Sequence, residues 1–481
     1  MTEQGIKVVG AATIKHNSPR DRFRNALARP EVAFLVLGLI FGMLMLAINP
    51  PFRIPDTILH FYKAYSISEF KIMPVVKPAE DGMPKRSGST GPRSFDTMEK
   101  GTGFRWPGGE FDVGDVGSAL DIPLNPGTTK FYNYGSNGRI ISSPVPYIPQ
   151  AVVIDIGKLF HLSPLLMVYA CGFFNLLIFL FLGYLAIVIT PVLKWTFVLL
   201  GLMPTTIHLT ASTSEYAFDI AICFITIAFF FRLALDPEKR QVERKDIFIL
   251  FALAFLLSLI KQPLFLLILL FFMIPRSKFG STRKYFFVFA ALFLFTILIA
   301  GSWSLIVSKA YIPPYATVVP HDRLVTLFHN PWEYVSNFFV SLSKNASVLP
   351  GTLVGRMGNV GQVGFPLWYI WTHLIVLAAV TVLDKGTVTA RVGQKAVSIV
   401  TLLIIIVVTF LLFKIYVDVD PRNMGDWLSG RYILPAAPLF FLLFYNLRIR
   451  FKKSMYFYSF IYCFAFLTIA FTVYKLLNAY Y

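Results

Sequence analysis

The sequence of 481 residues contains only three cysteines, and each lies inside a run of apolar residues. A free cysteine in such a run usually behaves as a small hydrophobic side chain, which argues against a disulfide framework or a thiolate metal site. The motifs of soluble catalysis are also missing, because there is no P-loop, no G-x-G-x-x-G, no H-E-x-x-H and no G-x-S-x-G. Residues 1–30 are polar and basic and lack a short apolar core before a cleavage site, so we expect no cleaved signal peptide.

Long apolar runs are the dominant feature that is present. The chain is 56% hydrophobic and 16% aromatic, and it repeats runs of about eighteen or more mostly apolar residues, which water-soluble domains do not carry. The sequence therefore predicts an all-α, polytopic bundle of transmembrane helices.

The formal net charge of +18 is unevenly distributed. The segments that we expect in the cytoplasm hold 22 of the 44 Lys and Arg residues but only 8 of the 26 Asp and Glu residues. This asymmetry follows the positive-inside rule and places the basic excess against anionic lipid headgroups. No soluble domain carries a basic and aromatic stripe, so we expect the lipid bilayer, and not nucleic acid, as the partner of this charge.

Placing every basic loop inside gives about eleven spans, with the N-terminus in and the C-terminus out. Termini on opposite sides of the membrane require an odd number of spans. The apolar stretch 247–275 must therefore be two short helices, at 247–260 and 263–275, separated where Pro263 breaks the helical hydrogen-bond ladder. Residues 195–211 and 431–447 are expected to be single spans. The predicted organisation is a basic N-terminus (1–31), a first span (32–50), an extracytoplasmic loop (52–164), spans two to seven (165–308), a second outer loop (309–365) and the last spans (366–481).

Residues 52–144 form the largest segment outside the membrane. The aromatic side chains of this segment can form a small core, so we expect an irregular but folded loop. We expect its middle, at 78–102, to be mobile because apolar residues are scarce there. A second interfacial helix is expected at 144–160, and an amphipathic stretch at 331–342 in the second outer loop. No internal repeat is present, which counts against a transporter built from inverted halves.

Residues 55–68 follow the first span and place Asp56 at the membrane surface. A helix here would carry Asp56, His60 and Lys63 on one face and apolar or aromatic residues on the other, and we expect it to lie in the interface with its polar face outward. Two interpretations of Asp56 stay open. It is a helix N-cap, or it is a catalytic base within reach of a sugar hydroxyl. His60 is either a polar contact or a structural residue.

Two cations lie at expected outer helix ends, namely Lys261 and Arg431. Each either extends its charged group to the interface or contributes to a phosphate site, since arginine offers a fork of donors and lysine a point charge. Glu215 and Asp219 are spaced to point the same way, and they either bind a cation or a sugar or follow a serine cap. The pair Asp418 and Asp420 resembles metal-binding carboxylates, although a solvated loop explains it more simply.

Two motifs contain some of these candidates: P-D-x-x-x-H-F-Y-x-A-Y from Pro55 includes Asp56 and His60, and G-R-Y-x-L-P from Gly430 includes Arg431. With them the chain resembles a large, poorly characterised bacterial family of polytopic membrane proteins whose members look like GT-C-type glycosyltransferases. The segment 146–150 and the break at 261–263 are similar to further family motifs. One position departs from the pattern, because Thr57 stands where the family often has a second acid, and this weakens any two-carboxylate or metal scheme.

The resemblance implies an inverting glycosyltransferase of the bacterial inner membrane. The donor would be a polyprenyl-phosphate-linked sugar, and the acceptor a polysaccharide or lipid-linked glycan outside the cytoplasm, with no metal indicated. Asp56 would be the base, and Lys261 and Arg431 would hold the donor phosphate. Candidates for further substrate contacts are Arg53, His60, Lys63, Tyr147, Gln150, Glu215 and Tyr432. The alternative is a transporter or flippase for polyprenyl-linked sugars, which needs the same cations but no base.

Overall fold

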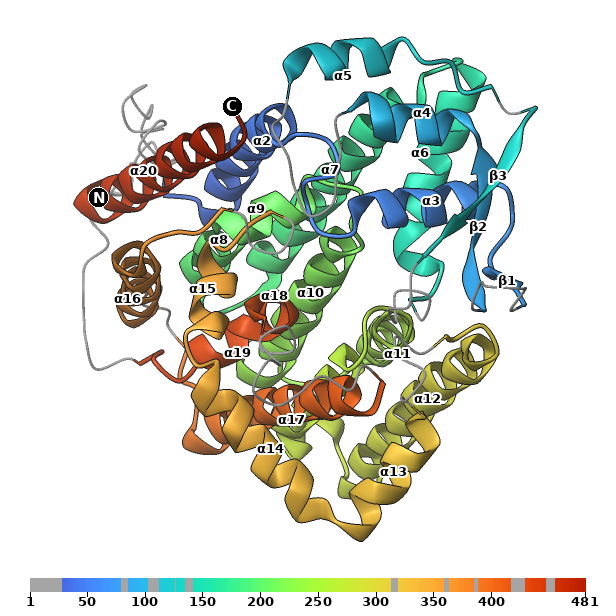
Figure 1. Cartoon of the computed structure of the whole chain (residues 1–481). Helices are drawn as coiled ribbons and strands as arrows, with labels where there is room; N and C mark the ends of the chain where they lie inside the picture. The colour runs from blue at the N-terminus through green and yellow to red at the C-terminus, as the bar shows by residue number, and fades with distance from the viewer. Residues whose placement is uncertain are drawn as a thin grey trace, which may run out of the picture.

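The computed structural model is mostly helical (Figure 1). It describes residues 28–78, 85–102, 112–125, 127–134, 142–312, 319–358, 363–384, 388–416, 429–446 and 455–481. The predicted N-terminal segment up to residue 27 and the aspartates at 418, 420 and 426 lie outside these ranges.

Six helices in the described part of the chain are long and apolar enough to cross a membrane. They are α2 (Pro30–Ile48), α7 (Pro164–Ile189), α10 (Tyr216–Leu235), α12 (Thr282–Ser308), α17 (Val392–Tyr416) and α20 (Met455–Tyr480). The apolar stretch of α10 is 83% buried within the protein, against 44% or less for the other five. Because a helix that is apolar on every side needs partners all round, α10 is the central helix of the bundle.

Several apolar stretches form short or broken helices instead of single spans. The break at Pro263 is present, between α11 (Arg244–Leu259) and a 3₁₀ segment, η3 (Leu264–Met273). The expectation of single helices at 195–211 and 431–447 is wrong, because prolines interrupt both stretches. The first is divided into α8 (Lys194–Gly201) and α9 (Pro204–Thr210), and the second contains α18 (Gly430–Ile433), η7 (Leu434–Ala436) and α19 (Ala437–Phe441).

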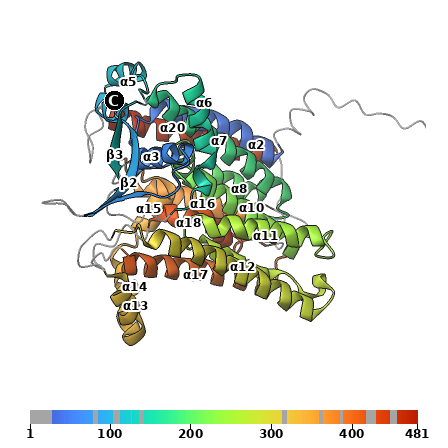
Figure 2. The ribbon, with the colours of Figure 1, turned by 90° about the vertical axis from the view of Figure 1, so that its right-hand side faces the viewer.

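The first large loop contains a small sheet, so the all-α expectation is wrong here. Strands β1 (Val75–Lys77), β2 (Arg86–Pro92) and β3 (Thr129–Asn133) pair antiparallel in that order, with Gly88 opposite both Val75 and Asn133. The sheet lies at one end of α10, α11 and α12 (Figure 2). Strand β2 reads Arg-Ser-Gly-Ser-Thr-Gly-Pro, which lacks the alternation of β-branched and aromatic residues that predicts a strand.

The middle of this loop, expected to be mobile, holds β2 and α4 (Ser94–Gly101), followed by α5 (Val113–Leu120). Phe95 and Met98 of α4 are fully buried and pack in the same cluster as Phe61 and Tyr65 of α3 (Thr57–Ser68). Two apolar residues on one face are thus enough to anchor α4. The expectation of a mobile middle therefore fails for β2 and α4.

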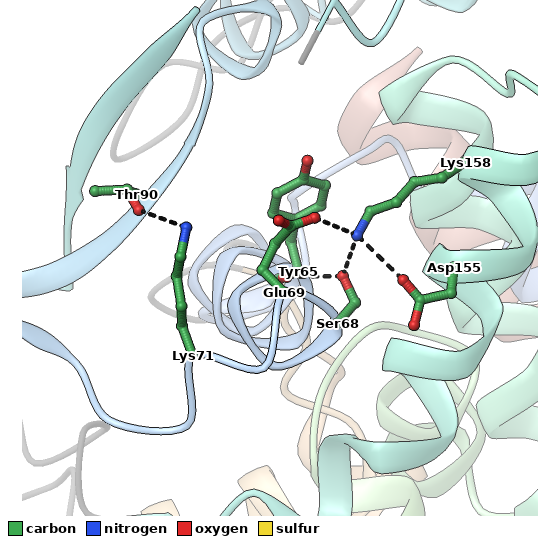
Figure 3. Close-up of polar contacts among 7 residues, drawn as sticks. All are labelled: Tyr65, Ser68, Glu69, Lys71, Thr90, Asp155 and Lys158. Carbon is green, nitrogen blue, oxygen red and sulfur yellow. Dashed lines mark hydrogen bonds and ion pairs between the residues drawn. The ribbon is translucent and has the colours of Figure 1, made fainter. Parts of the chain in front are cut away.

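Helix α3 is buried on nearly all sides, which corrects the expectation of an interfacial helix with an exposed polar face. It packs against β2 and against α6 (Ile148–Leu159), the helix predicted at 144–160, which follows η2 (Val145–Tyr147). Lys158 of α6 joins the two helices at the end of α3, where its Nζ lies 2.5 Å from Glu69 Oε1 and 2.7 Å from Ser68 Oγ (Figure 3).

The second loop forms α13 (Pro320–His329), α14 (Pro331–Lys344) and α15 (Val348–Val354), and it contains the predicted amphipathic stretch within α14. Helices α13 and α14 project at the bottom of Figures 1 and 2, while α15 packs against α18 and α16. The remaining elements are η4 (Arg276–Phe279) and α16 (Leu367–Leu383).

Candidate functional site

Asp56 occupies the N-cap position of α3 but does not act as a capping side chain. Its backbone is left-handed, with φ 66°, and its carboxylate makes no capping hydrogen bond. A left-handed conformation is unfavourable for a residue other than glycine and is often found at functional sites. The carboxylate instead interacts electrostatically with Arg431 and Tyr432. The capping interpretation therefore fails, and the acid at the start of α3 is within electrostatic range of a cation 375 residues further along the sequence.

Lys261 projects from the break between α11 and η3 into a group of aromatic rings. Its Nζ donates a hydrogen bond to Tyr216 Oη at 2.9 Å and lies 3.8 Å from Glu215 Oε1. The same ammonium lies 4.5 Å from the ring centres of both Tyr216 and Tyr432. Because Pro263 prevents a continuous helix, Lys261 stands at the end of α11, where its charge can reach these partners.

Arg431 opens the short helix α18 next to Lys261. Its Nη2 donates to Tyr432 Oη at 3.1 Å, and its guanidinium carbon lies 5.1 Å from the Tyr432 ring centre. The buried Nε has no hydrogen-bond partner among the described residues. Gly430 is needed in front of it, because a Cβ at this position would lie 2.3 Å from the backbone nitrogen of Leu353 in α15. Close packing of α18 on α15 thus positions the arginine.

The two cations line one small pocket. Its wall is built from α10, the break before η3, α17 and α18. The lining residues with polar groups are Tyr216, Asp219, Lys261, Gln262, Thr409, Arg431 and Tyr432, and the apolar ones are Pro263, Leu264, Leu412, Phe413 and Pro435. Two cations, phenolic hydroxyls and an apolar wall suit a ligand with an anionic group and a hydrophobic part.

Glu215 connects this pocket to α3 through Tyr147. Tyr147 Oη donates to Glu215 Oε2 at 2.9 Å and lies 2.7 Å from His60 Nδ1. Since the phenol has a single proton and gives it to Glu215, the His60 contact requires a proton on Nδ1. The chain His60, Tyr147, Glu215, Lys261 thus runs from the first large loop into the bundle. The Ser214 hydroxyl accepts from the Tyr216 N–H at 3.3 Å, so a serine bonds the start of α10 while the Glu215 side chain takes other partners.

Lys63 lies on the same side of α3 as His60. Its Nζ is 4.8 Å from the Tyr147 ring centre and donates to the backbone carbonyl of Ser142. Burial lowers the pKa of Lys63 to about 8, against a smaller opposing effect of Glu215. Burial, and then the nearby Glu215 carboxylate, raise the pKa of Tyr147 well above its ordinary value, so this phenol remains a donor.

The other predicted contact residues are placed less centrally. Arg53 is buried, and its guanidinium lies 6.0 Å from the ring centre of Tyr480 in α20. Gln150 of α6 is fully buried, and neither atom of its amide group has a hydrogen-bond partner in the described part of the chain. The described residues contain no group of three or more His, Cys, Asp or Glu side chains that could hold a metal ion.

Sequence reasoning did not select several pocket residues, notably Tyr216, Gln262, Thr409 and Phe413. Tyr216 directly follows Glu215, and Gln262 directly follows Lys261. Their position next to a candidate residue is the signal in the sequence that could have identified them. Thr409 and Phe413 lie inside the apolar run of α17, where nothing in the sequence distinguishes them.

Comparison with models of protein families matches residues 39–440, well over half of the chain, to a family described as predicted membrane protein (DUF2142). Neither the curated proteins nor the solved structures give a match. The chain therefore belongs to the DUF2142 family of predicted membrane proteins, and its several long apolar helices make it a multi-pass membrane protein.

Proposed function

We propose that this protein is a GT-C-type glycosyltransferase of the bacterial inner membrane. It takes a sugar from a polyprenyl-phosphate-linked donor and transfers it to a polysaccharide or lipid-linked glycan on the extracytoplasmic face. The observation that carries the proposal is the meeting of Lys261 and Arg431 at the ring of Tyr432, within electrostatic range of Asp56 on α3.

The cations suit the donor phosphate. Lys261 offers a point charge and Arg431 a planar set of donors, and both border a pocket whose remaining wall contains polar and apolar residues in equal number. As the bond between the anomeric carbon and the phosphate oxygen breaks, negative charge grows on the phosphate. Fixed cations stabilise this charge more in the transition state than in the bound donor, which lowers the barrier.

Asp56 suits the role of general base. Its carboxylate takes the proton from an acceptor hydroxyl, the oxygen attacks the anomeric carbon, and polyprenyl phosphate leaves from the opposite side with inversion of configuration. Asp56 is also within electrostatic range of Arg431, one of the two cations assigned to the phosphate. One acid without a second carboxylate at Thr57 is sufficient for this single displacement.

The substitution Asp56→Asn tests the proposal in membranes or detergent supplied with donor and acceptor. Transfer is expected to fall by at least about 100-fold, as for loss of a general base, while donor binding persists. The matched control is Asp121→Asn at the exposed end of α5, which should transfer normally. Near-normal transfer by the Asp56 variant would sink the proposal.

A transporter or flippase for polyprenyl-linked sugars is the alternative, because broken helices around a cation-lined pocket also occur in transporters. Such a protein should move the labelled lipid across a vesicle membrane without acceptor. It should also keep that activity in the Asp56→Asn variant.

A further inference from the structure

Asp219 lies one helical turn after Glu215 on α10 and borders the same pocket as Lys261 and Arg431. The residue is completely buried, and neither carboxyl oxygen makes a hydrogen bond of ordinary geometry to the described residues, although the backbone N–H and the ammonium of Lys261 are near enough to interact with it. Glu215, by contrast, receives a hydrogen bond from Tyr147 and lies beside Lys261. Of these two neighbouring acids, Glu215 has partners within the protein and Asp219 faces the pocket.

A buried carboxyl group whose oxygens lack good hydrogen bonds is costly, because it has lost its hydration and the neighbouring Lys261 replaces only part of it. A ligand bound in the pocket would supply the missing hydrogen bonds. Both oxygens of Asp219 are open to further hydrogen bonds, and hydroxyl groups of a ligand can make them because a hydroxyl both donates and accepts.

The surrounding charges narrow the chemistry of that ligand. A metal ion at Asp219 would be repelled by Lys261 and Arg431, and no cluster of metal ligands is found in the described part of the chain. A ligand that carries both a phosphate and hydroxyl groups suits this pocket. The phosphate can bind Lys261 and Arg431, and the hydroxyl groups can bind the carboxyl of Asp219. Gln262 and Thr409 also line this pocket, although their side chains already bond Ser304 and Ile405.

We propose that Asp219 binds hydroxyl groups of the donor sugar and contributes to the choice of sugar. This inference rests on the proposed function, because it assigns Asp219 to the sugar that is attached to the donor phosphate. It also distinguishes Asp219 from Asp56, which serves the acceptor and does not contribute to the affinity for the donor.

The test compares two kinds of lipid bound to the full-length protein in detergent. One is polyprenyl phosphate, and the other is a panel of polyprenyl-phosphate-linked glucose, galactose, mannose and arabinose. Wild-type protein is expected to bind at least one sugar-bearing lipid more tightly than polyprenyl phosphate. The Asp219→Asn variant should lose at least tenfold in affinity for that lipid while binding polyprenyl phosphate within about twofold of wild type.

The matched control is Thr226→Val, two turns further along the same face of α10 and outside the pocket, which should bind both lipids normally. If Asp219→Asn fails to fold, Asp219→Ser replaces it. Equal losses for both lipids, or no loss for either, would overturn the assignment of Asp219. A wild-type protein that binds polyprenyl phosphate but gains nothing from any sugar would overturn it too. Failure of wild type to bind either lipid would instead refute the proposed function.

Discussion

The ion pair between Glu215 and Lys261 gives a test of the site geometry that needs no substrate. Their charged atoms lie 3.8 Å apart, and Glu215 is buried while the Lys261 side chain is 29% exposed. At an effective dielectric constant of about 20, two charges at this distance attract by about 4 kcal/mol. Desolvation and side-chain ordering offset part of this, so we expect a net coupling of about 2 kcal/mol.

The substitution Glu215→Gln removes the charge but keeps an oxygen that can accept from Tyr147. We expect this variant to lower the free energy of unfolding by about 2 kcal/mol, because Lys261 then lacks its counter-charge. In the background of Lys261→Met, the same change should cost far less. The difference between the two costs is the coupling energy.

The assay is unfolding of the purified protein in mixed micelles with increasing dodecyl sulfate, followed by tryptophan fluorescence. Glu238→Gln, in the exposed loop between α10 and α11, is the matched control and should leave the unfolding curve unchanged. Strictly additive effects of the Glu215 and Lys261 changes would refute the reasoning, since an interacting pair cannot behave as two independent sites.

Two further predictions concern the surroundings of the site. Burial lowers the pKa of Lys63 to about 8 in the folded protein, against about 10.4 when the amine is solvated in the unfolded state. Between these two pH values the unfolded state binds more protons than the folded state, so the free energy of unfolding should rise with pH. The same micelle unfolding assay should show that Lys63→Met removes the rise, and an unchanged pH slope would contradict the pKa argument. Gly430→Ala places a Cβ 2.3 Å from the Leu353 backbone and should lower stability by about 1–3 kcal/mol and donor binding with it. Gly301→Ala, which meets nothing within 4 Å, is the control, and equal melting of both variants would disprove the close packing.

Part of the candidate site could be predicted from the sequence. Asp56, Lys261 and Arg431 each stand next to a proline or glycine break at the end of an apolar run, where a charge is unusual. Asp219 was noticed only for its spacing from Glu215, because the sequence does not say which acid has partners. Tyr147 and His60 lie 87 residues apart and meet only through the packing of α3 and α6.

The environment of α3 shows the same limit. Its pattern of one polar and one apolar face predicts a helix at an interface, and the helix itself is present. Strand β2 and helix α4 cover it, and β2 comes from a glycine- and serine-rich stretch with no strand signal. A polar face buried by other parts of the chain cannot be told from an exposed one by periodicity alone.

The sequence alone determined that the protein is a multi-pass helical membrane protein, since long apolar runs are stable as helices in a membrane and a proline in the interior of such a run breaks the helix. It also determined which charged residues stand at helix ends. The tertiary structure decided which of these charges meet. Ion pairs and hydrogen bonds between distant segments depend on distances of a few ångströms, and only the packing of α3, α10, η3 and α18 sets those distances.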